Sequence, residues 1–504
     1  MSGVVDRRDA ERFRAAVSHR LGLQFDDTKL AFLGEVLQRR ADRLGGSAAA
    51  YLRGLEAGPG RTEFAALAQE LTVGETYFFR NSEQFHALRE LVLPERMATK
   101  PEIKTLRILS AGCASGEEAY SIAIIARETI TDPSWAISIR AVDLNPAVLE
   151  KASRARFSSW ALRETPPEAR SKWFRPDGRE WILAETVRDA VRFEARNLAS
   201  DDDELWQPQT FDVVFCRNVL IYFAPEPARA LIARITRALQ PGGYLFLGHA
   251  DTLRGLSDNF HLRHTHGTFY YQLKEGVDHL IAPPPPAHPG WISTGGAGIA
   301  LPSFRDAWVD AIREASERIA ALVPATKATK PPEAAPPQWD LARALDLLRT
   351  ERFGEALALL RELPLEAARD PDVLLLEAML LAQSHQPAAA EATCQRLLAI
   401  DELNAGAHYV LALCRESAGD GDGAAEHDRV AVYLDPAFAM PRLHLGLLAR
   451  RMGARDVARR ELAQGLVLLQ REDASRLLLF AGGFNRDALM ALCGSALRDC
   501  GGQP

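Results

Sequence analysis

The sequence lacks the features of a membrane-spanning or exported chain. A helix that crosses a bilayer needs about 20 consecutive apolar residues, and no run approaches that length. The N-terminal residues 1–13 contain no apolar signal core. Charge of one sign is not in large excess either, because a formal charge of −7 on 504 residues is far from the basic balance of a nucleic-acid-binding chain. These absences predict a cytoplasmic protein that is not membrane-embedded and binds no nucleic acid.

Cysteine is also scarce. Six cysteines are scattered along the chain, and none forms a Cys-x-x-Cys pair. This pattern argues against a zinc knuckle and against a disulfide framework, so we expect no metal site. Hydrophobic residues make up 47% and charged residues 25%, which is typical of folded globular protein. At roughly 100–200 residues a domain, the length predicts about three domains.

Composition and periodicity divide the first part of the chain. Residues 1–95 carry apolar residues at helical spacing and are expected to form a small all-α domain. Residues 96–275 alternate short apolar runs with helical patterns, which predicts an α/β domain whose parallel sheet is covered on both faces. Within it, residues 156–193 are a candidate antiparallel insertion around the tight turn at Asp177–Gly178. Residues 276–338 are rich in proline and alanine, which is typical of an extended linker.

A 34-residue repeat follows the linker. Small residues keep this step in two columns, Ala344, Ala378, Ala412 and Gly446, and Ala356, Ala390, Ala424 and Ala458. A period of 34 is typical of the tetratricopeptide helix–turn–helix unit, whose helices pack closely. We therefore expect a C-terminal all-α tetratricopeptide (TPR) solenoid over 339–472, followed by a cap or tail over 473–504.

The segment Ser110–Glu118 joins the first predicted strand of the α/β region to its helix. Gly112 and Gly116, with the small Ala114 between them, let the backbone approach a ligand closely. The carboxyl end of a strand is where nucleotide-like ligands bind an open α/β sheet. The alternative is a tight strand–helix turn that binds nothing.

Asp143 ends the next predicted strand. A carboxylate at this place can accept hydrogen bonds from ribose hydroxyls, or it can cap the helix that starts near Pro146. The glycine loop lacks the Gly-x-Gly-x-x-Gly pattern that brings a pyrophosphate against a helix terminus. We therefore expect a ligand without a diphosphate, which favours S-adenosylmethionine (SAM) over NAD.

Two further segments carry polar residues that a core does not explain. Arg217, Asn218 and Tyr222 follow a predicted buried strand and should lie at its carboxyl end. Thr76–Arg80 sets an arginine beside aromatic residues, which in the alternative interpretation are simply core. The acidic run Asp201–Glu204 is interpreted as a solvated loop, and it would repel nucleic-acid phosphates.

Five motifs occur in a fixed order over about residues 10–275. They are Thr76–Arg80, Ser110–Ser121, Ala141–Asn145, Phe215–Phe223 and Leu239–His249. Together they resemble the CheR-type chemoreceptor glutamate methyltransferases. The resemblance implies a small helical domain joined to a Rossmann-like SAM-dependent methyltransferase domain. It also implies methylation of glutamate side chains on methyl-accepting chemotaxis receptors, giving glutamyl γ-methyl esters and S-adenosylhomocysteine for chemosensory adaptation.

The candidate site residues combine the loop pattern with this resemblance. Arg80 and Tyr222 are the candidate catalytic residues: Arg80 would orient a carboxylate, and Tyr222, from its position, would line the methyl channel. The candidate cofactor-binding residues are Thr76, Arg80, Gly112, Ala114, Gly116, Glu118, Asp143, Asn197, Leu198, Asn218 and Val219. Two positions depart from the family pattern: Gly74 stands where asparagine is frequent, and His249–Asp251 replaces the usual His-Ser-Glu.

The chemistry suits a site without an obvious catalytic histidine or cysteine. A glutamate side chain has an ordinary pKa near 4.3, so at neutral pH it is already an anionic nucleophile and needs no general base. The site must instead align the reacting atoms. The expected partners are a receptor cytoplasmic domain and a further protein bound by the repeats. The alternative function is a TPR scaffold whose SAM-binding domain is regulatory or inactive.

Overall fold

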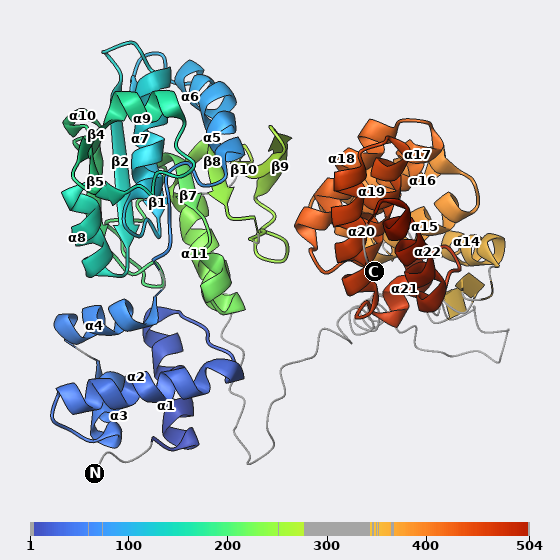
Figure 1. Cartoon of the computed structure of the whole chain (residues 1–504). Helices are drawn as coiled ribbons and strands as arrows, with labels where there is room; N and C mark the ends of the chain where they lie inside the picture. The colour runs from blue at the N-terminus through green and yellow to red at the C-terminus, as the bar shows by residue number, and fades with distance from the viewer. Residues whose placement is uncertain are drawn as a thin grey trace, which may run out of the picture. The chain divides into compact units, whose positions relative to one another are not determined.

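The computed structural model separates the chain into two compact units, within residues 1–286 and 287–504. The first contains a helical bundle and a sheet, and the second is helical (Figure 1). The structure describes residues 5–276 without 59, 73 and 250, residues 352–501 without 364–366, and residues 343, 344, 347, 348 and 350. The expected linker therefore lies outside the described residues, apart from its first position.

Four helices form a bundle at the N-terminus (Figure 1): α1 (Arg7–Leu21), α2 (Leu30–Arg43), α3 (Ala48–Ala57) and α4 (Arg61–Leu71). Their apolar faces share one core, in which Phe13, Leu33 and Leu52 are fully buried. The side chain of Asp6 caps α1 by accepting a hydrogen bond from the Asp9 N–H at 2.7 Å. The predicted helical N-terminal region is confirmed.

The next helical segment packs on the sheet. It consists of α5 (Ser82–Ala87), the π-helical turn η2 (Leu88–Val92) and α6 (Leu93–Ala98). Phe85, Leu88 and Val92 share a core with the strands and not with the N-terminal bundle. The loop in front of α5 therefore runs from the bundle to the sheet.

A seven-stranded mixed sheet forms the centre of the first unit. Its order is β6 (Val191–Ala195), β2 (Ala136–Asp143), β1 (Thr105–Ala111), β7 (Phe211–Cys216), β8 (Leu239–Leu247), β10 (Thr268–Leu273) and β9 (Phe260–Thr265). The first five of these strands are parallel to one another. Helices α7 (Glu117–Thr129), α8 (Pro146–Arg154) and α11 (Pro225–Ala238) follow β1, β2 and β7 along the chain. This arrangement confirms a Rossmann-like core.

The structure differs from the expected parallel sheet at one edge. β10 is antiparallel to both β8 and β9. His266 and Gly267 join β9 to β10 with φ angles of 54° and 69°. Two residues of positive φ are what a tight two-residue hairpin needs, so the chain reverses there without a helix.

A second, three-stranded antiparallel sheet lies inside the segment for which an insertion was expected. Its order is β3 (Arg156–Ser158), β5 (Glu180–Leu183) and β4 (Phe174–Asp177). Gly178 turns the chain from β4 into β5 with a φ of 61°. Helix α9 (Pro167–Trp173) precedes β4, and α10 (Glu185–Arg188) follows β5.

Three helix pairs make up most of the described part of the second unit. They are α15 (Pro371–Gln383) with α16 (Pro387–Ile400), α17 (Ala405–Ser417) with α18 (Gly421–Leu434), and α19 (Ala439–Arg451) with α20 (Arg455–Leu469). The first helices of successive pairs begin 34 residues apart, and so do the second helices, as the 34-residue repeat predicts. The small residues lie at close contacts: Ala378 and Ala412 are fully buried, and a Cβ on Gly446 would lie 2.6 Å from Cγ of Leu462.

Helices flank the three pairs at both ends. α14 (Phe353–Arg361) precedes them, and α21 (Ala474–Phe480) and α22 (Arg486–Asp499) follow. The Phe480 ring lies 5.8 Å from that of Tyr409 and 4.9 Å from that of Phe438. The amide of Gln383 donates to the carbonyl oxygen of Leu479 at 3.3 Å. The chain after the third pair thus packs back on the helices that open the pairs.

Within the described ranges, no helix is both long and apolar enough to cross a membrane. In the same part of the chain, no group of three or more histidine, cysteine, aspartate or glutamate residues could hold a metal ion. All six cysteines are buried free thiols.

Candidate functional site

A cavity of about 260 Å³ lies where strands β1, β2 and β7 end. The carboxyl ends of neighbouring parallel strands are where open α/β sheets bind their ligands. The wall of the cavity comes from segments that are distant in sequence. These are residues 21–23, 71–85, 112–118, 143–148, 197–198 and 217–223.

The loop after β1 brings bare backbone to the cavity wall. Gly112 has a φ of 77°, and a Cβ there would lie 2.5 Å from Cγ2 of Val219, so only glycine fits. The Gly112 N–H donates to the carbonyl oxygen of Val142 at 2.8 Å, which ties the loop to β2. Ala114 is also left-handed, with a φ of 46°. The loop is therefore held in a shape that leaves room for a ligand.

Asp143 ends β2 and lines the cavity beside this loop. Its carboxylate accepts hydrogen bonds from the N–H groups of Ala114 at 2.9 Å and Asn145 at 2.8 Å. Burial raises the pKa of Asp143 above its ordinary value, and these two donors oppose that effect. Asn145 caps α8 by accepting from the Ala147 N–H, so the alternative interpretation of Asp143 as the cap is wrong.

A second carboxylate, Glu118, lines the cavity from the first turn of α7. The Ser110 hydroxyl donates to its Oε1 at 2.7 Å, and Nη1 of Arg217 lies 3.5 Å from its Oε2. Burial raises the pKa of Glu118, and the Arg217 guanidinium opposes this. Nη2 of Arg217 donates to the carbonyl oxygen of Arg80 at 2.5 Å. These contacts connect Glu118 to the loop that carries Arg80.

Tyr77 and Arg80 line the cavity from the loop between α4 and α5. Phe79 and Asn81 have positive φ angles of 57° and 61° although neither is glycine. Strained backbone conformations of this kind are frequent at functional sites, where the contacts around them hold the backbone in place. Phe78 and Phe79 are buried core residues, as the alternative interpretation held, and this leaves Thr76, Tyr77 and Arg80 for the cavity.

Asn197 and Leu198 line the cavity from the loop after β6. The Asn197 side-chain amide donates to the carbonyl oxygen of Arg20 at 3.0 Å, and its Oδ1 accepts from the Ala199 N–H at 2.9 Å. The carbonyl oxygen of Leu198 accepts from the buried Arg234 at 2.8 Å. Asn197 therefore has a structural task besides its predicted cofactor contact.

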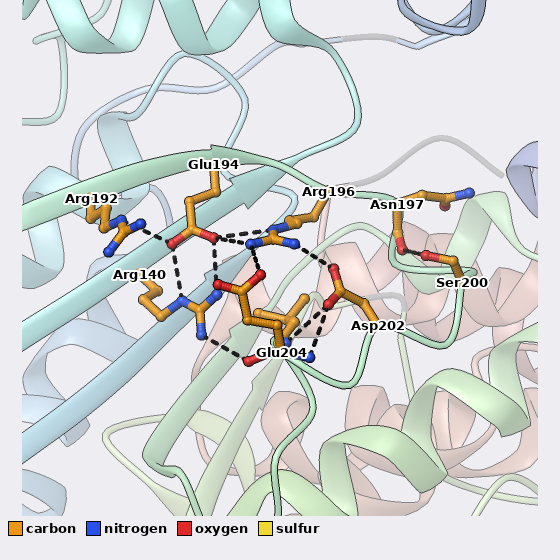
Figure 2. Close-up of polar contacts among 9 residues, drawn as sticks. Arg140, Arg192, Glu194, Arg196, Asn197, Ser200, Asp202 and Glu204 are labelled. Carbon is orange, nitrogen blue, oxygen red and sulfur yellow. Dashed lines mark hydrogen bonds and ion pairs between the residues drawn. The ribbon is translucent and has the colours of Figure 1, made fainter. Parts of the chain in front are cut away.

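The acidic run that follows this loop is paired with arginines (Figure 2). Arg196 donates to Asp202 at 2.9 Å and to Glu204 at 2.8 Å. Glu194 accepts from Arg140 and Arg196, each at 2.9 Å. Burial would raise the pKa of Glu194, but the two guanidinium groups bring it below its ordinary value. Asp201, Asp203 and Glu204 are exposed, as the interpretation of a solvated loop predicts, whereas Asp202 is half-buried and paired with Arg196.

Asn218 follows β7 and lines the cavity with a φ of 56°. Its N–H donates to Oδ2 of Asp251 at 2.9 Å. Burial raises the pKa of Asp251 to about 6. A Cβ on Gly248 would lie 2.8 Å from this carboxylate oxygen and from the Asn218 nitrogen, so the contact depends on glycine. The aspartate that departs from the family pattern holds the backbone of a cavity residue.

The N-terminal bundle completes the wall. Leu21 and Leu23, at and just after the end of α1, line the cavity. The Gln24 N–H donates to the carbonyl oxygen of Tyr222 at 2.7 Å, and Leu23 forms an antiparallel bridge with Phe223. Tyr222 therefore lies at the cavity wall where the bundle meets the sheet, and it is 39% exposed.

The structure brings nearly all predicted site residues around this one cavity. Those that line it are Thr76, Arg80, Gly112, Ala114, Glu118, Asp143, Asn197, Leu198, Asn218, Val219 and Tyr222. Gly116 does not line it: a Cβ there would lie 2.8 Å from Ala152 and 3.0 Å from Phe193, so this glycine serves helix–sheet packing. Leu21 and Leu23 also line the cavity and were not predicted to do so, because no local sequence pattern indicates it.

The cavity combines carboxylates with guanidinium groups. Asp143 can accept hydrogen bonds from ribose hydroxyls, and Arg80 can donate to a carboxylate. The carboxylate of Glu118 can offset the positive charge of a sulfonium or an ammonium group. Gly112 leaves the backbone bare where a ligand must approach. This set of protein groups fits SAM, which carries ribose hydroxyls, a carboxylate, an ammonium group and a sulfonium.

Comparison with known proteins agrees with this site. Residues 74–269 match the model of the family "CheR methyltransferase, SAM binding domain". The chain is 34% identical to "Chemotaxis protein methyltransferase 2" of Vibrio cholerae over 54% of this chain and 96% of that protein. It is 33% identical to "Chemotaxis protein methyltransferase 1" of Pseudomonas aeruginosa, over 51% and 89%. A longer match reaches "Probable biofilm formation methyltransferase WspC" of P. aeruginosa, at 29% identity over 89% of this chain and 96% of that protein.

Proposed function

The chain belongs to the CheR methyltransferase family, and we propose that it methylates glutamate side chains of methyl-accepting chemotaxis receptors. It is a SAM-dependent methyltransferase of chemosensory signalling, and SAM is its cofactor. The observation that carries the proposal is the single cavity at which the Gly112 loop, Asp143 and Arg80 meet. The products of the proposed reaction are glutamyl γ-methyl esters and S-adenosylhomocysteine.

The proposed roles of the cavity residues follow from their positions. Asp143 binds the ribose hydroxyls, and Asn197 and Leu198 lie near the adenine. Thr76, Gly112, Ala114, Glu118, Asn218 and Val219 complete the cofactor contacts, whereas Gly116 supports them through packing. When bound, the cofactor supplies a methyl group activated by its sulfonium.

The chain's own task in this reaction is alignment. The acceptor carboxylate is already ionised at neutral pH, so no side chain needs to remove a proton. Holding the acceptor oxygen in line with the methyl carbon and sulfur can lower the barrier by on the order of 7–11 kcal/mol. Arg80 orients a carboxylate, and Tyr222 borders the path of the acceptor. A tight ion pair between Arg80 and the acceptor would blunt its nucleophilicity, so we assign Arg80 an orienting role.

Binding of S-adenosylhomocysteine separates this proposal from a scaffold function. Calorimetry on the full chain should give a measurable heat, because the cavity and its charged groups are already formed. Asp143→Ala should abolish or strongly weaken binding, whereas Asp177→Ala, on the exposed β4–β5 turn, should leave it unchanged. No heat with the unmodified chain would favour the scaffold.

Radiolabel transfer tests the acceptor. The chain is incubated with labelled SAM and purified receptor cytoplasmic fragments from the same organism. Label that is released as methanol by alkali shows a carboxyl methyl ester, which distinguishes glutamate methylation from methylation of nitrogen. Label that resists alkali would contradict the proposed acceptor.

We further propose that the three helix pairs are tetratricopeptide repeats that bind a protein partner. Their 34-residue spacing and the buried small residues support this assignment. The match to the P. aeruginosa methyltransferase extends over 451 residues, which includes the repeats as well as the catalytic part. The proposed division of labour gives catalysis to residues 1–275 and targeting or regulation to 339–472.

A further inference from the structure

An arginine outside the cavity stacks on one of the aromatic rings that line it. Arg163 belongs to the turn after β3, and its Cζ lies 3.6 Å from the centre of the Tyr77 ring. The ring of Trp160 lies 4.2 Å from the same Cζ. Nη1 of Arg163 donates to the carbonyl oxygen of Trp160 at 2.8 Å. The guanidinium is therefore fixed by two rings and one hydrogen bond.

The turn that carries Arg163 is joined to the cavity loop. The Phe78 N–H donates to the carbonyl oxygen of Ala161 at 2.9 Å, which pairs the two segments next to Tyr77. Tyr77 lines the cavity, and the Cζ of Arg80 lies 5.7 Å from the centre of its ring. One ring therefore contacts the cavity arginine and the outer arginine together.

The charge of Arg163 has no partner in the described part of the chain. No carboxylate there forms an ion pair with it, and the same holds for Arg80. A nearby arginine shows the contrast, since Arg156 on β3 pairs with Asp177 at 2.6 Å and Glu180 at 2.8 Å. When aromatic rings stack on the plane of a guanidinium, its N–H groups at the edge can still donate two hydrogen bonds to one carboxylate. Trp160 is 68% exposed and Arg163 is half-buried, so this stacked pair lies at the protein surface.

We propose that Arg163 is a specificity-determining residue that binds a second carboxylate of the acceptor segment, next to the glutamate that is methylated. The proposal rests on the proposed function. An acceptor helix that presents two acidic side chains three or four residues apart sets them about 5–6 Å apart at Cβ. Arg80 and Arg163, on one ring, offer two cationic groups for such a pair. The partner class is therefore an acidic helical segment and not an isolated glutamate.

Two matched acceptors test this inference. Both are receptor cytoplasmic fragments with one glutamate left for methylation. The acidic acceptor keeps the acidic side chains within one helical turn of that glutamate, and the neutral acceptor carries glutamine at those positions. Turnover is measured as kcat and KM on both, for the unmodified chain and for Arg163→Gln. Arg170→Gln is the control, because Arg170 stacks on Trp181 at 4.1 Å in the same insertion without touching Tyr77.

Arg163→Gln should lower kcat/KM on the acidic acceptor roughly tenfold, mostly through KM, since a charge-assisted contact is lost. It should leave the neutral acceptor and the affinity for S-adenosylhomocysteine unchanged. Arg163→Lys should restore only part of the preference because it lacks the planar fork. An equal loss on both acceptors, or the same loss with Arg170→Gln, overturns the proposal.

Binding keeps the two proposals distinguishable. The same fragments, fluorescently labelled, are titrated by anisotropy against the full chain saturated with S-adenosylhomocysteine. If the unmodified chain transfers no methyl group, the proposed function fails, and the role of Arg163 is still decided by whether Arg163→Gln removes the preference for the acidic fragment. A preference that survives the substitution refutes the role of Arg163 whatever the turnover.

Discussion

Gly112→Ala offers a direct test of how the glycine loop is built. Two costs are expected. A left-handed alanine costs about 1–2 kcal/mol relative to glycine, and the φ of Gly112 is 77°. The added Cβ would lie 2.5 Å from Cγ2 of Val219, and overpacking of this kind costs about 1–3 kcal/mol. The substitution should therefore destabilise the first unit by roughly 2–5 kcal/mol.

A second substitution separates the two costs. Val219→Ala removes Cγ2 and leaves the Val219 Cβ 3.8 Å from the new methyl group, which is ordinary contact. The double variant should recover about 1–3 kcal/mol of the loss, since only the overpacking is relieved. Gly178→Ala is the matched control, because its φ is 61° and a Cβ there meets nothing within 4 Å. It should show the left-handed cost alone.

Scanning calorimetry of the full chain measures these differences. Because the chain has two units, the transition of the first is identified by its upward shift when S-adenosylhomocysteine is added. A loss of 1 kcal/mol corresponds to about 2–4 °C for a unit of this size. If the unfolding temperature of the double variant is no higher than that of Gly112→Ala, the contact with Val219 is not the source of the lost stability. That result would refute the proposed overpacking in the loop.

Three further predictions concern the two units, a buried acid and the cavity rim. A fragment of residues 1–286 should bind S-adenosylhomocysteine with an affinity within about twofold of that of the full chain, because the described cavity wall lies in this unit. Calorimetry measures this affinity, and loss of binding would contradict the proposed division of labour. Burial raises the pKa of Glu117 to about 7, so the folded state binds the extra proton and stability falls as pH rises from about 4.5 to 7. Glu117→Gln should remove this fall, on the order of 3 kcal/mol, and raise the unfolding temperature at pH 8 but not at pH 4.5. Tyr222→Phe should lower kcat with unchanged affinity for S-adenosylhomocysteine, and full turnover would show that its hydroxyl has no role.

Local patterns in the sequence are enough to predict the parts of the site that follow single strands. Gly112 and Asp143 stand at strand ends, where the alternation of apolar runs and turns marks both the sheet and its ligand edge. The repeat columns are equally local, because each small residue marks one helix crossing. In these cases one stretch of chain contains the whole signal.

The remaining features depend on contacts between distant segments. Gly116 has the same sequence signature as Gly112, but the group that approaches it closely is Ala152 and not the cavity. Leu21 looks like any other core leucine, and only the docking of the bundle on the sheet places it at the cavity. The stacking of Arg163 on Tyr77 joins segments that are more than eighty residues apart, and no spacing rule connects them.

The closure of the cavity by the bundle has a kinetic consequence. The carbonyl oxygen of Arg20 accepts from the Asn197 amide, and the Gln24 N–H donates to the carbonyl oxygen of Tyr222, so two hydrogen bonds connect the end of α1 and the residues after it to two stretches of the rim. An adenosine-sized molecule that enters or leaves past this rim must break or bypass them. We therefore expect a covalent tether between α1 and the sheet to slow the loading and release of any nucleoside that passes this part of the wall.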